Sequence, residues 1–183
     1  PPIGIQVILD SYRGPFEDGE DPRGFEWYYW SRQCQRWTQR LEGHTRPVLA
    51  VDITSDGRWI VSGSHDGTIR VWDSHDGSSR VIEAHEGSVY ALAISPDGQT
   101  IASGGLDKMI RCWDLNSGTN TAQWQGHDGT VFCLAYSGDG KHLVSGGSDT
   151  LVKRWEIASQ TATTTYQGHI DFVYCVDISP DGA

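Results

Sequence analysis

The sequence has no apolar run long enough to cross a membrane, and no secretory signal peptide is visible in it. It also contains no G-x-x-x-x-G-K-[ST] phosphate-binding loop. Its repeated segments lack the 3.6-residue apolar periodicity of amphipathic helices. These absences argue against a membrane-spanning protein, a P-loop nucleotidase and a helical domain. The net charge of −10 argues against a general phosphate-binding surface.

Cysteines, and histidines outside the repeated pattern described below, are also few. The four cysteines show no C-x-x-C spacing and are interpreted as small buried strand residues in a reducing compartment. Of the seven histidines, three stand in turns or at strand starts without the spacing of a ligand cluster, so no metal and no cofactor are expected. The residues in question are Cys34, Cys112, Cys133 and Cys175, and His65, His75 and His142.

What the sequence does contain is a four-residue pattern written three times. A His is followed 18 residues later by a Ser, four further on by an Asp, and six further on by a Trp with an acidic neighbour. A fixed period of this length predicts supersecondary units that bury their apolar faces only by stacking. The sets are His44, Ser62, Asp66 and Trp72; His85, Ser103, Asp107 and Trp113; His127, Ser145, Asp149 and Trp155; and a fourth His, His169.

Each repeat predicts four short antiparallel strands. Runs rich in β-branched, aromatic and apolar residues alternate with turn signals such as Asp-Gly, which supply the positive φ of a tight hairpin. The expected strands are residues 48–54, 59–64, 69–73 and 80–84; 88–94, 100–105, 110–115 and 120–125; and 131–136, 142–147, 152–157 and 161–167.

The repeats divide the chain into units of residues 44–84, 85–126 and 127–168, followed by a truncated start of a further unit at 169–183. Residues 25–43 are interpreted as a degenerate unit remnant with strands at 25–31 and 35–42, because Trp30 precedes His44 by the spacing that separates Trp113 from His127. Residues 1–24, rich in Pro, Gly and acid, are expected to be irregular or a linker. Since the chain begins with Pro1 and stops inside a turn, we expect a piece of a longer polypeptide.

These motifs resemble the WD-repeat β-propeller family over residues 41–183. The pairs Gly43-His44, Gly126-His127 and Gly168-His169 match its Gly-His, and Trp72-Asp73 and Trp113-Asp114 match its Trp-Asp. Two positions differ from this pattern: Ala84 replaces the Gly before His85, and Glu156 replaces the Asp after Trp155. Both pairs are expected to keep their shape or charge. The resemblance implies an all-β fold, a partial and open propeller of four-stranded antiparallel blades. It also implies that Trp, Ser, His and Asp form a buried hydrogen-bond chain in each blade.

A Ser, a His and an Asp in every repeat also match the composition of a nucleophilic triad. A catalytic set is needed once and in a cleft, whereas this set recurs with the period of the blades. We therefore expect a structural network and no enzyme, and no unique acid, base or nucleophile stands elsewhere in the sequence.

The resemblance further implies a protein-interaction platform. Contact positions in the family lie three and five residues after the His and one before the Asp, and here they are rich in aromatic and aliphatic residues. An equally supported alternative is that Leu49, Tyr90, Phe132 and Tyr174 only line a central channel. The expected partner-binding residues are Pro47, Leu49, His65, Ser88, Tyr90, Leu106, Thr130, Phe132, Ser148, Phe172 and Tyr174.

The resulting hypothesis is a noncatalytic scaffold or sensing array that binds other proteins or peptides in the cytoplasm, with the nucleus as a second possibility. The alternative is a nucleic-acid-associated subunit of the RNA-processing type, since residues 27–40 interleave aromatics with Arg. Alternating sheet residues explain the same pattern, so nucleic acid is not the expected partner. No membrane partner is expected, and an open array could self-associate through its unpaired edges.

Overall fold

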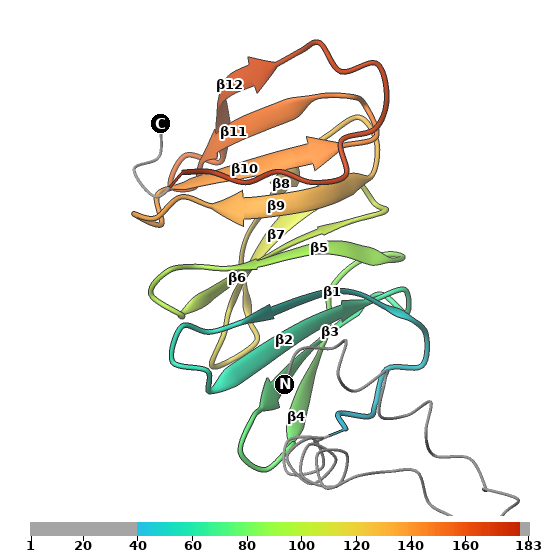
Figure 1. The fold of residues 1–183 in the computed structure, drawn as a ribbon, viewed down its shortest axis with the longest axis vertical. Coiled ribbons are helices and arrows are strands. Elements are labelled where there is room, and N and C mark those ends of the chain that lie inside the picture. Colours follow the sequence, from blue (N-terminus) through green and yellow to red (C-terminus); the bar gives the residue numbers. More distant parts are fainter. Residues whose placement is uncertain (1–39, 180–183) are drawn as a thin grey trace, which may run out of the picture. The chain divides into compact units, whose positions relative to one another are not determined.

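The computed structural model describes residues 40–179, which form twelve strands in three antiparallel sheets of four strands each (Figure 1). In each sheet the strands are hydrogen-bonded in chain order. The first sheet contains β1 (Val48–Ile53), β2 (Trp59–Ser64), β3 (Thr68–Asp73) and β4 (Ser79–Glu83). The second contains β5 (Val89–Ile94), β6 (Thr100–Gly105), β7 (Met109–Asp114) and β8 (Asn120–Gln125). The third contains β9 (Val131–Tyr136), β10 (His142–Gly147), β11 (Val152–Glu156) and β12 (Thr161–Tyr166).

The all-β prediction with four-stranded antiparallel units is confirmed, and each strand end lies within one residue of its expected place. The alternation of apolar and polar residues and the turn signals carried this information, since both are local. The strands expected at residues 25–31 and 35–42 fall almost wholly outside the described residues, and residues 40–42 are not in a strand.

Neighbouring sheets pack through their first strands, and β1, β5 and β9 follow one another along the array (Figure 1). Glycines on the second strands permit this close approach. A Cβ on Gly63 would lie 2.7 Å from Cγ1 of Val89, and one on Gly104 would lie 2.5 Å from Cγ1 of Val131. Both valines are completely buried, so each glycine receives a side chain of the following sheet.

Two apolar cores fill the spaces between the sheets. The first joins side chains of β2, β3 and β4 to those of β5, β6 and β7, with Trp113 among them. The second joins side chains of the four strands of the second sheet to those of β9, β10 and β11. It contains Trp124 and Trp155, whose ring centroids are 5.9 Å apart. The cores therefore lie between the sheets, and each sheet depends on its neighbours for burial.

The outer face of β1 has no covering sheet among the described residues. Val48 and Val51 are 47% and 63% exposed, whereas Val89 and Leu92, at the same repeat positions on β5, are 0% and 9% exposed. The residues of β1 thus have the composition of a buried interface.

At the other end, the segment after β12 lies against the third sheet. The Val173 amide donates to the Gly147 carbonyl at 3.1 Å, and a Cβ on Gly146 would lie 2.5 Å from Cγ1 of Val173. Val173 is 6% exposed. The contact between glycine and valine is therefore made a third time, by a segment that is not in a strand.

The turn that follows the second strand of each sheet requires one residue with positive φ. Gly67 fills this place in the first sheet at φ 86°, but Lys108 and Thr150 fill it in the second and third at 69° and 67°. Positive φ is a genuine outlier for a β-branched residue such as Thr150. The third turn therefore stores backbone strain.

We expect Thr150→Gly to raise the free energy of unfolding by about 1 kcal/mol. Relief of the left-handed strain, of order 1–3 kcal/mol, exceeds the roughly 0.5–1 kcal/mol that glycine loses in chain entropy. Urea unfolding followed by tryptophan fluorescence measures the change. The reverse substitution, Gly67→Thr, should destabilise, because a Cβ there would lie 2.8 Å from the His85 carbonyl oxygen. A lower unfolding midpoint for Thr150→Gly would contradict the strain argument.

Candidate interaction surface

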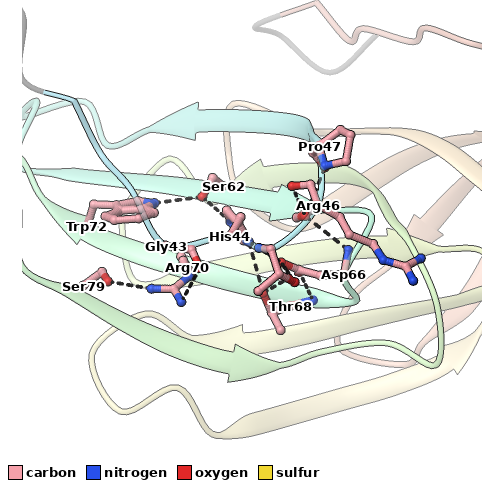
Figure 2. Close-up of polar contacts among 12 residues, drawn as sticks. Gly43, His44, Arg46, Pro47, Ser62, Asp66, Thr68, Arg70, Trp72 and Ser79 are labelled. Carbon is pink, nitrogen blue, oxygen red and sulfur yellow. Dashed lines mark hydrogen bonds and ion pairs between the residues drawn. The ribbon is translucent and has the colours of Figure 1, made fainter.

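A chain of hydrogen bonds runs through the first sheet, as Figure 2 shows. The Trp72 indole N–H on β3 donates to the Ser62 hydroxyl oxygen on β2 at 2.8 Å. This hydroxyl lies 2.8 Å from Nε2 of His44, which precedes β1, and Nδ1 of His44 lies 3.1 Å from a carboxylate oxygen of Asp66 in the turn after β2. Since the carboxylate only accepts, Nδ1 carries the proton and the serine donates to Nε2.

The second and third sheets repeat these contacts. The distance from the Trp indole nitrogen to the Ser hydroxyl oxygen is 2.8 Å in both sheets. The Ser hydroxyl oxygen lies 2.8 and 2.7 Å from Nε2 of the His, and Nδ1 of the His lies 2.8 Å from Oδ1 of the Asp in both. His169, the fourth histidine, is exposed. The residues that the structure brings together are His85, Ser103, Asp107 and Trp113, and His127, Ser145, Asp149 and Trp155.

Burial and hydrogen bonding set the charges in this network. Burial lowers the pKa of His85 and of His127, although the adjacent carboxylates act in the opposite direction. Burial would raise the pKa of Asp107, but hydrogen bonds from Arg111 and His85 outweigh it and the pKa is lowered. In the second and third sheets the network therefore holds neutral imidazoles beside ionised carboxylates at neutral pH.

The serines have no access to a substrate in this arrangement. Ser103 and Ser145 are 0% exposed and Ser62 is 5% exposed, and each hydroxyl oxygen already accepts an indole N–H. A nucleophilic serine must reach its substrate, and these buried hydroxyls already bond a Trp and a His. The geometry is that of an internal brace between strands.

The second sheet differs from the other two in the bonding of the basic side chain on its third strand. Arg70 donates to the Gly43 carbonyl at 2.8 Å, and Lys153 donates to the Gly126 carbonyl at 2.9 Å. Arg111, at the same repeat position, instead bonds Asp107 at 2.5 Å, with Nη1 2.6 Å from Nδ1 of His85.

Ala84 explains the departure. A Cβ on Gly43 would lie 2.4 Å from Nη1 of Arg70, so a residue with a side chain cannot share that place with the cation. The expectation that Ala84 keeps the shape of the glycine is therefore wrong. Arg111 was not predicted as a member of the network, although the alanine at position 84, where two other repeats have Gly, is a visible signal in the sequence.

Four of the predicted partner-binding residues form one aromatic cluster. The Phe132 ring on β9 lies 5.3 Å from the Tyr90 ring on β5, and 5.8 and 5.1 Å from the rings of Phe172 and Tyr174 (centroid distances). Phe172 and Tyr174 are 46% and 66% exposed, and their own rings are 6.1 Å apart. The cluster, defined here as Tyr90, Phe132, Phe172 and Tyr174, thus presents aromatic surface from three repeats to solvent.

The remaining predicted contact residues divide by exposure. Ser88 is 1% exposed and its hydroxyl contacts the His65 ring, so its predicted place on the surface is wrong: it joins the second sheet to the turn after β2. Thr130 and Ser148 are half-buried. Pro47, Leu49, His65 and Leu106 are exposed, near the same strand ends as the cluster.

The cysteines follow their expected burial only in part. Cys112 and Cys133 are buried, and burial raises the pKa of each thiol to about 11. Cys175 is exposed, so its interpretation as a buried strand residue is wrong. Cys34 and the stretch of Arg and aromatics at 27–39 lie outside the described residues.

Within residues 40–179, no three His, Cys, Asp or Glu side chains lie together as a metal site would require. In the same part of the chain, no helix is long and apolar enough to span a membrane.

Comparison with known proteins finds relatives over short segments. The chain is 53% identical over 32 residues to the ribosome biogenesis protein BOP1 homolog of Oryza sativa, a match covering 18% of this chain and 5% of that protein. It is 50% identical over 38 residues to the U3 small nucleolar RNA-associated protein 21 of Saccharomyces cerevisiae, covering 21% of this chain and 4% of that protein. The matches thus span about one twentieth of these relatives' length.

The fold has a solved counterpart in the structure of U3-55K. The two agree with a TM-score of 0.69 and 31% sequence identity over 72% of this chain and 42% of that one. The family model described as "WD domain, G-beta repeat" matches residues 35–73, 77–114, 118–156 and 160–183, which together exceed half of the chain. With three four-stranded antiparallel sheets in an open array, the chain belongs to the WD40 repeat family and forms part of a β-propeller.

Proposed function

We propose that this chain is part of a noncatalytic scaffold, and that a protein or peptide partner docks on the aromatic cluster. The observation that carries the proposal is the meeting of the Tyr90, Phe132, Phe172 and Tyr174 rings, of which Phe172 and Tyr174 are 46% and 66% exposed. Aromatic side chains supply large contact area at low entropic cost and are enriched among the residues that dominate binding energy. Leu49 and Leu106, which are 41% and 49% exposed, extend the apolar surface.

The network supports this role by holding the strands rigid beneath the cluster. Tyr90 and Phe132 lie on β5 and β9, and each of these strands follows a histidine that is bonded to the second strand and to the next turn. A rigid surface binds with a smaller loss of conformational entropy than a mobile one. The same rigidity and the inaccessible serines favour a binding role over a catalytic one.

A second candidate is an RNA-associated assembly subunit in the nucleus. The names of two relatives refer to ribosome biogenesis and to the U3 small nucleolar RNA, and the solved counterpart is U3-55K. These names favour the nucleus over the predicted cytoplasm. The net charge of −10 argues against direct contact between this chain and RNA.

The double variant Tyr90→Ala/Phe132→Ala tests the docking surface. Partners captured by the wild-type chain are identified, purified and titrated against both forms by calorimetry. We expect at least a tenfold loss of affinity, since two interface aromatics are removed. Tyr166→Ala is the matched control, because Tyr166 is an aromatic 52% exposed on β12, outside the cluster.

Two outcomes would count against the proposal. Unchanged affinity in the double variant, with an unchanged melting temperature, would remove the cluster as the docking surface. Capture that is lost on ribonuclease treatment and falls steeply with added salt would replace the protein partner with RNA.

A further inference from the structure

A pocket of about 400 Å³ opens between the second and third sheets, at the strand ends opposite the aromatic cluster. It lies between the turns that follow β5 and β9, the first strands of these sheets. The lining residues are Ser95, Pro96, Asp97, Thr100, Tyr136, Gly138, Asp139, Gly140 and Ile157. Nothing in the proposed function uses this end of the molecule.

The pocket follows from two departures from the repeat. Thr100 begins β6 at the place where β2 begins with Trp59, a large side chain that packs against the first core. Tyr136 ends β9 where β1 and β5 end with Ile53 and Ile94. A small residue therefore leaves space beside the second core, and an aromatic ring borders it.

The edge of the pocket is acidic. Asp97 accepts hydrogen bonds through Oδ1 from the Ser95 hydroxyl at 2.5 Å and the Gln99 amide at 3.0 Å. Asp139 accepts equivalent bonds through Oδ1 from the Ser137 hydroxyl at 2.6 Å and the Lys141 amide at 3.0 Å. In each case the described bonds use one oxygen, which leaves the second carboxylate oxygen available to a ligand.

The charges around the pocket favour a cation. Hydrogen bonds from the turn lower the pKa of Asp97 and of Asp139, so both are ionised at neutral pH. The basic residues nearby are Lys141 and His142, which follow Asp139 in the chain, and Nδ1 of His142 lies 3.9 Å from Oδ1 of Asp139. Neither belongs to the pocket lining, which contains two carboxylates and no basic side chain.

We propose that this pocket binds the guanidinium group of an arginine side chain presented by a partner polypeptide. A guanidinium is planar and fully charged; it stacks on an aromatic face such as the Tyr136 ring and bonds carboxylates such as Asp97 and Asp139. The Pro96 ring and the Ile157 side chain cover its aliphatic stem. The pocket thus provides a second contact for a partner, at the far end of the strands from the aromatic cluster and independent of it.

Titration with N-acetyl-arginine amide tests the site, with N-acetyl-citrulline amide as the neutral probe of the same shape. Amide shifts of Gly138 and Gly140, which line the pocket, report binding in ¹H–¹⁵N spectra. We expect saturable shifts at Gly138 and Gly140 with a Kd on the order of 1 mM, as a small ligand allows, and at least tenfold weaker binding of the citrulline probe. Equal shifts with both probes would overturn the charge argument.

Two sets of variants separate the pocket from general charge effects. Thr100→Trp fills the pocket with the side chain that β2 already carries, and it should abolish the shifts. Asp97→Asn/Asp139→Asn removes both charges while keeping the accepting Oδ1 of each turn, and should weaken binding at least tenfold. Asp56→Asn is the matched control, because Asp56 accepts the same two kinds of bond in the turn after β1, outside the pocket. Wild-type binding by the double variant would contradict the proposal.

Discussion

Ser103→Ala is expected to lower the free energy of unfolding by about 3 to 5 kcal/mol. The substitution removes the acceptor of the Trp113 indole N–H and the donor to His85 Nε2, both at 2.8 Å. Trp113 is 6% exposed and the His85 side chain 0%, so water cannot replace the lost partner. Each buried polar group left unpaired costs about 1–3 kcal/mol, and the small cavity adds to this. Urea unfolding followed by circular dichroism measures the loss.

Ser55→Ala provides the control, since Ser55 is an exposed serine in the turn after β1. A double-mutant cycle with Trp113→Phe sharpens the test, because Ser103→Ala should cost less in the background that no longer presents an indole N–H. Additive losses would show that the two side chains are not coupled. Full stability of Ser103→Ala, together with loss of a hydrolytic activity, would instead favour a nucleophilic serine.

Gly104→Ala should destabilise the chain by about 3 kcal/mol, a large effect for one added methyl group. The new Cβ would lie 2.5 Å from Cγ1 and 2.9 Å from Cβ of Val131, so the second and third sheets must separate locally. Forcing extra volume into a close-packed core typically costs about 1–3 kcal/mol, and here both partners are on stiff strands. The melting temperature and near-ultraviolet circular dichroism report the change.

The valine supplies the test of this mechanism. Val131→Ala alone should also destabilise, because Val131 is completely buried, but the pair Gly104→Ala/Val131→Ala should cost less than the sum of the two. The shorter side chain leaves room for the methyl group that Gly104→Ala adds. Simple additivity would place the cost of Gly104→Ala in the β6 backbone and not between the sheets.

The strands were predictable because their signals are local. Asp-Gly turns and alternating apolar residues place β6, for example, at its observed bounds of Thr100–Gly105. The meeting of Trp113, Ser103 and His85 was expected from the resemblance to a family, and the recurrence of the set in every repeat already favoured a structural network over a catalytic triad. The burial of Ser103 agrees with the structural interpretation, and this burial is a property of the stacked sheets that the spacing does not show.

Other features depend on contacts that no spacing reveals. Arg111 turns toward Asp107 because Ala84 occupies the space that Gly43 leaves to Arg70. The pocket arises where Thr100 replaces a large residue, and its position across from Tyr136 is set by the packing of two sheets. The burial of Ser88 likewise follows from the approach of His65 from another sheet. Each is a departure from the repeat whose effect appears only once neighbours are in place.

The matched repeats and the sheets are out of step. The segment 77–114 starts with β4, the outer strand of the first sheet, and ends with β7; the segment 118–156 starts with β8, which closes the second. The matched segments 77–114 and 118–156 therefore each contribute their first strand to the preceding sheet. A fragment cut at the ends of the matched segment 77–114 would contain β4 without the rest of the first sheet and would lack β8. Cleavage between residues 84 and 85 would instead leave complete four-stranded sheets on both sides. An engineer who recombines these modules should place junctions there.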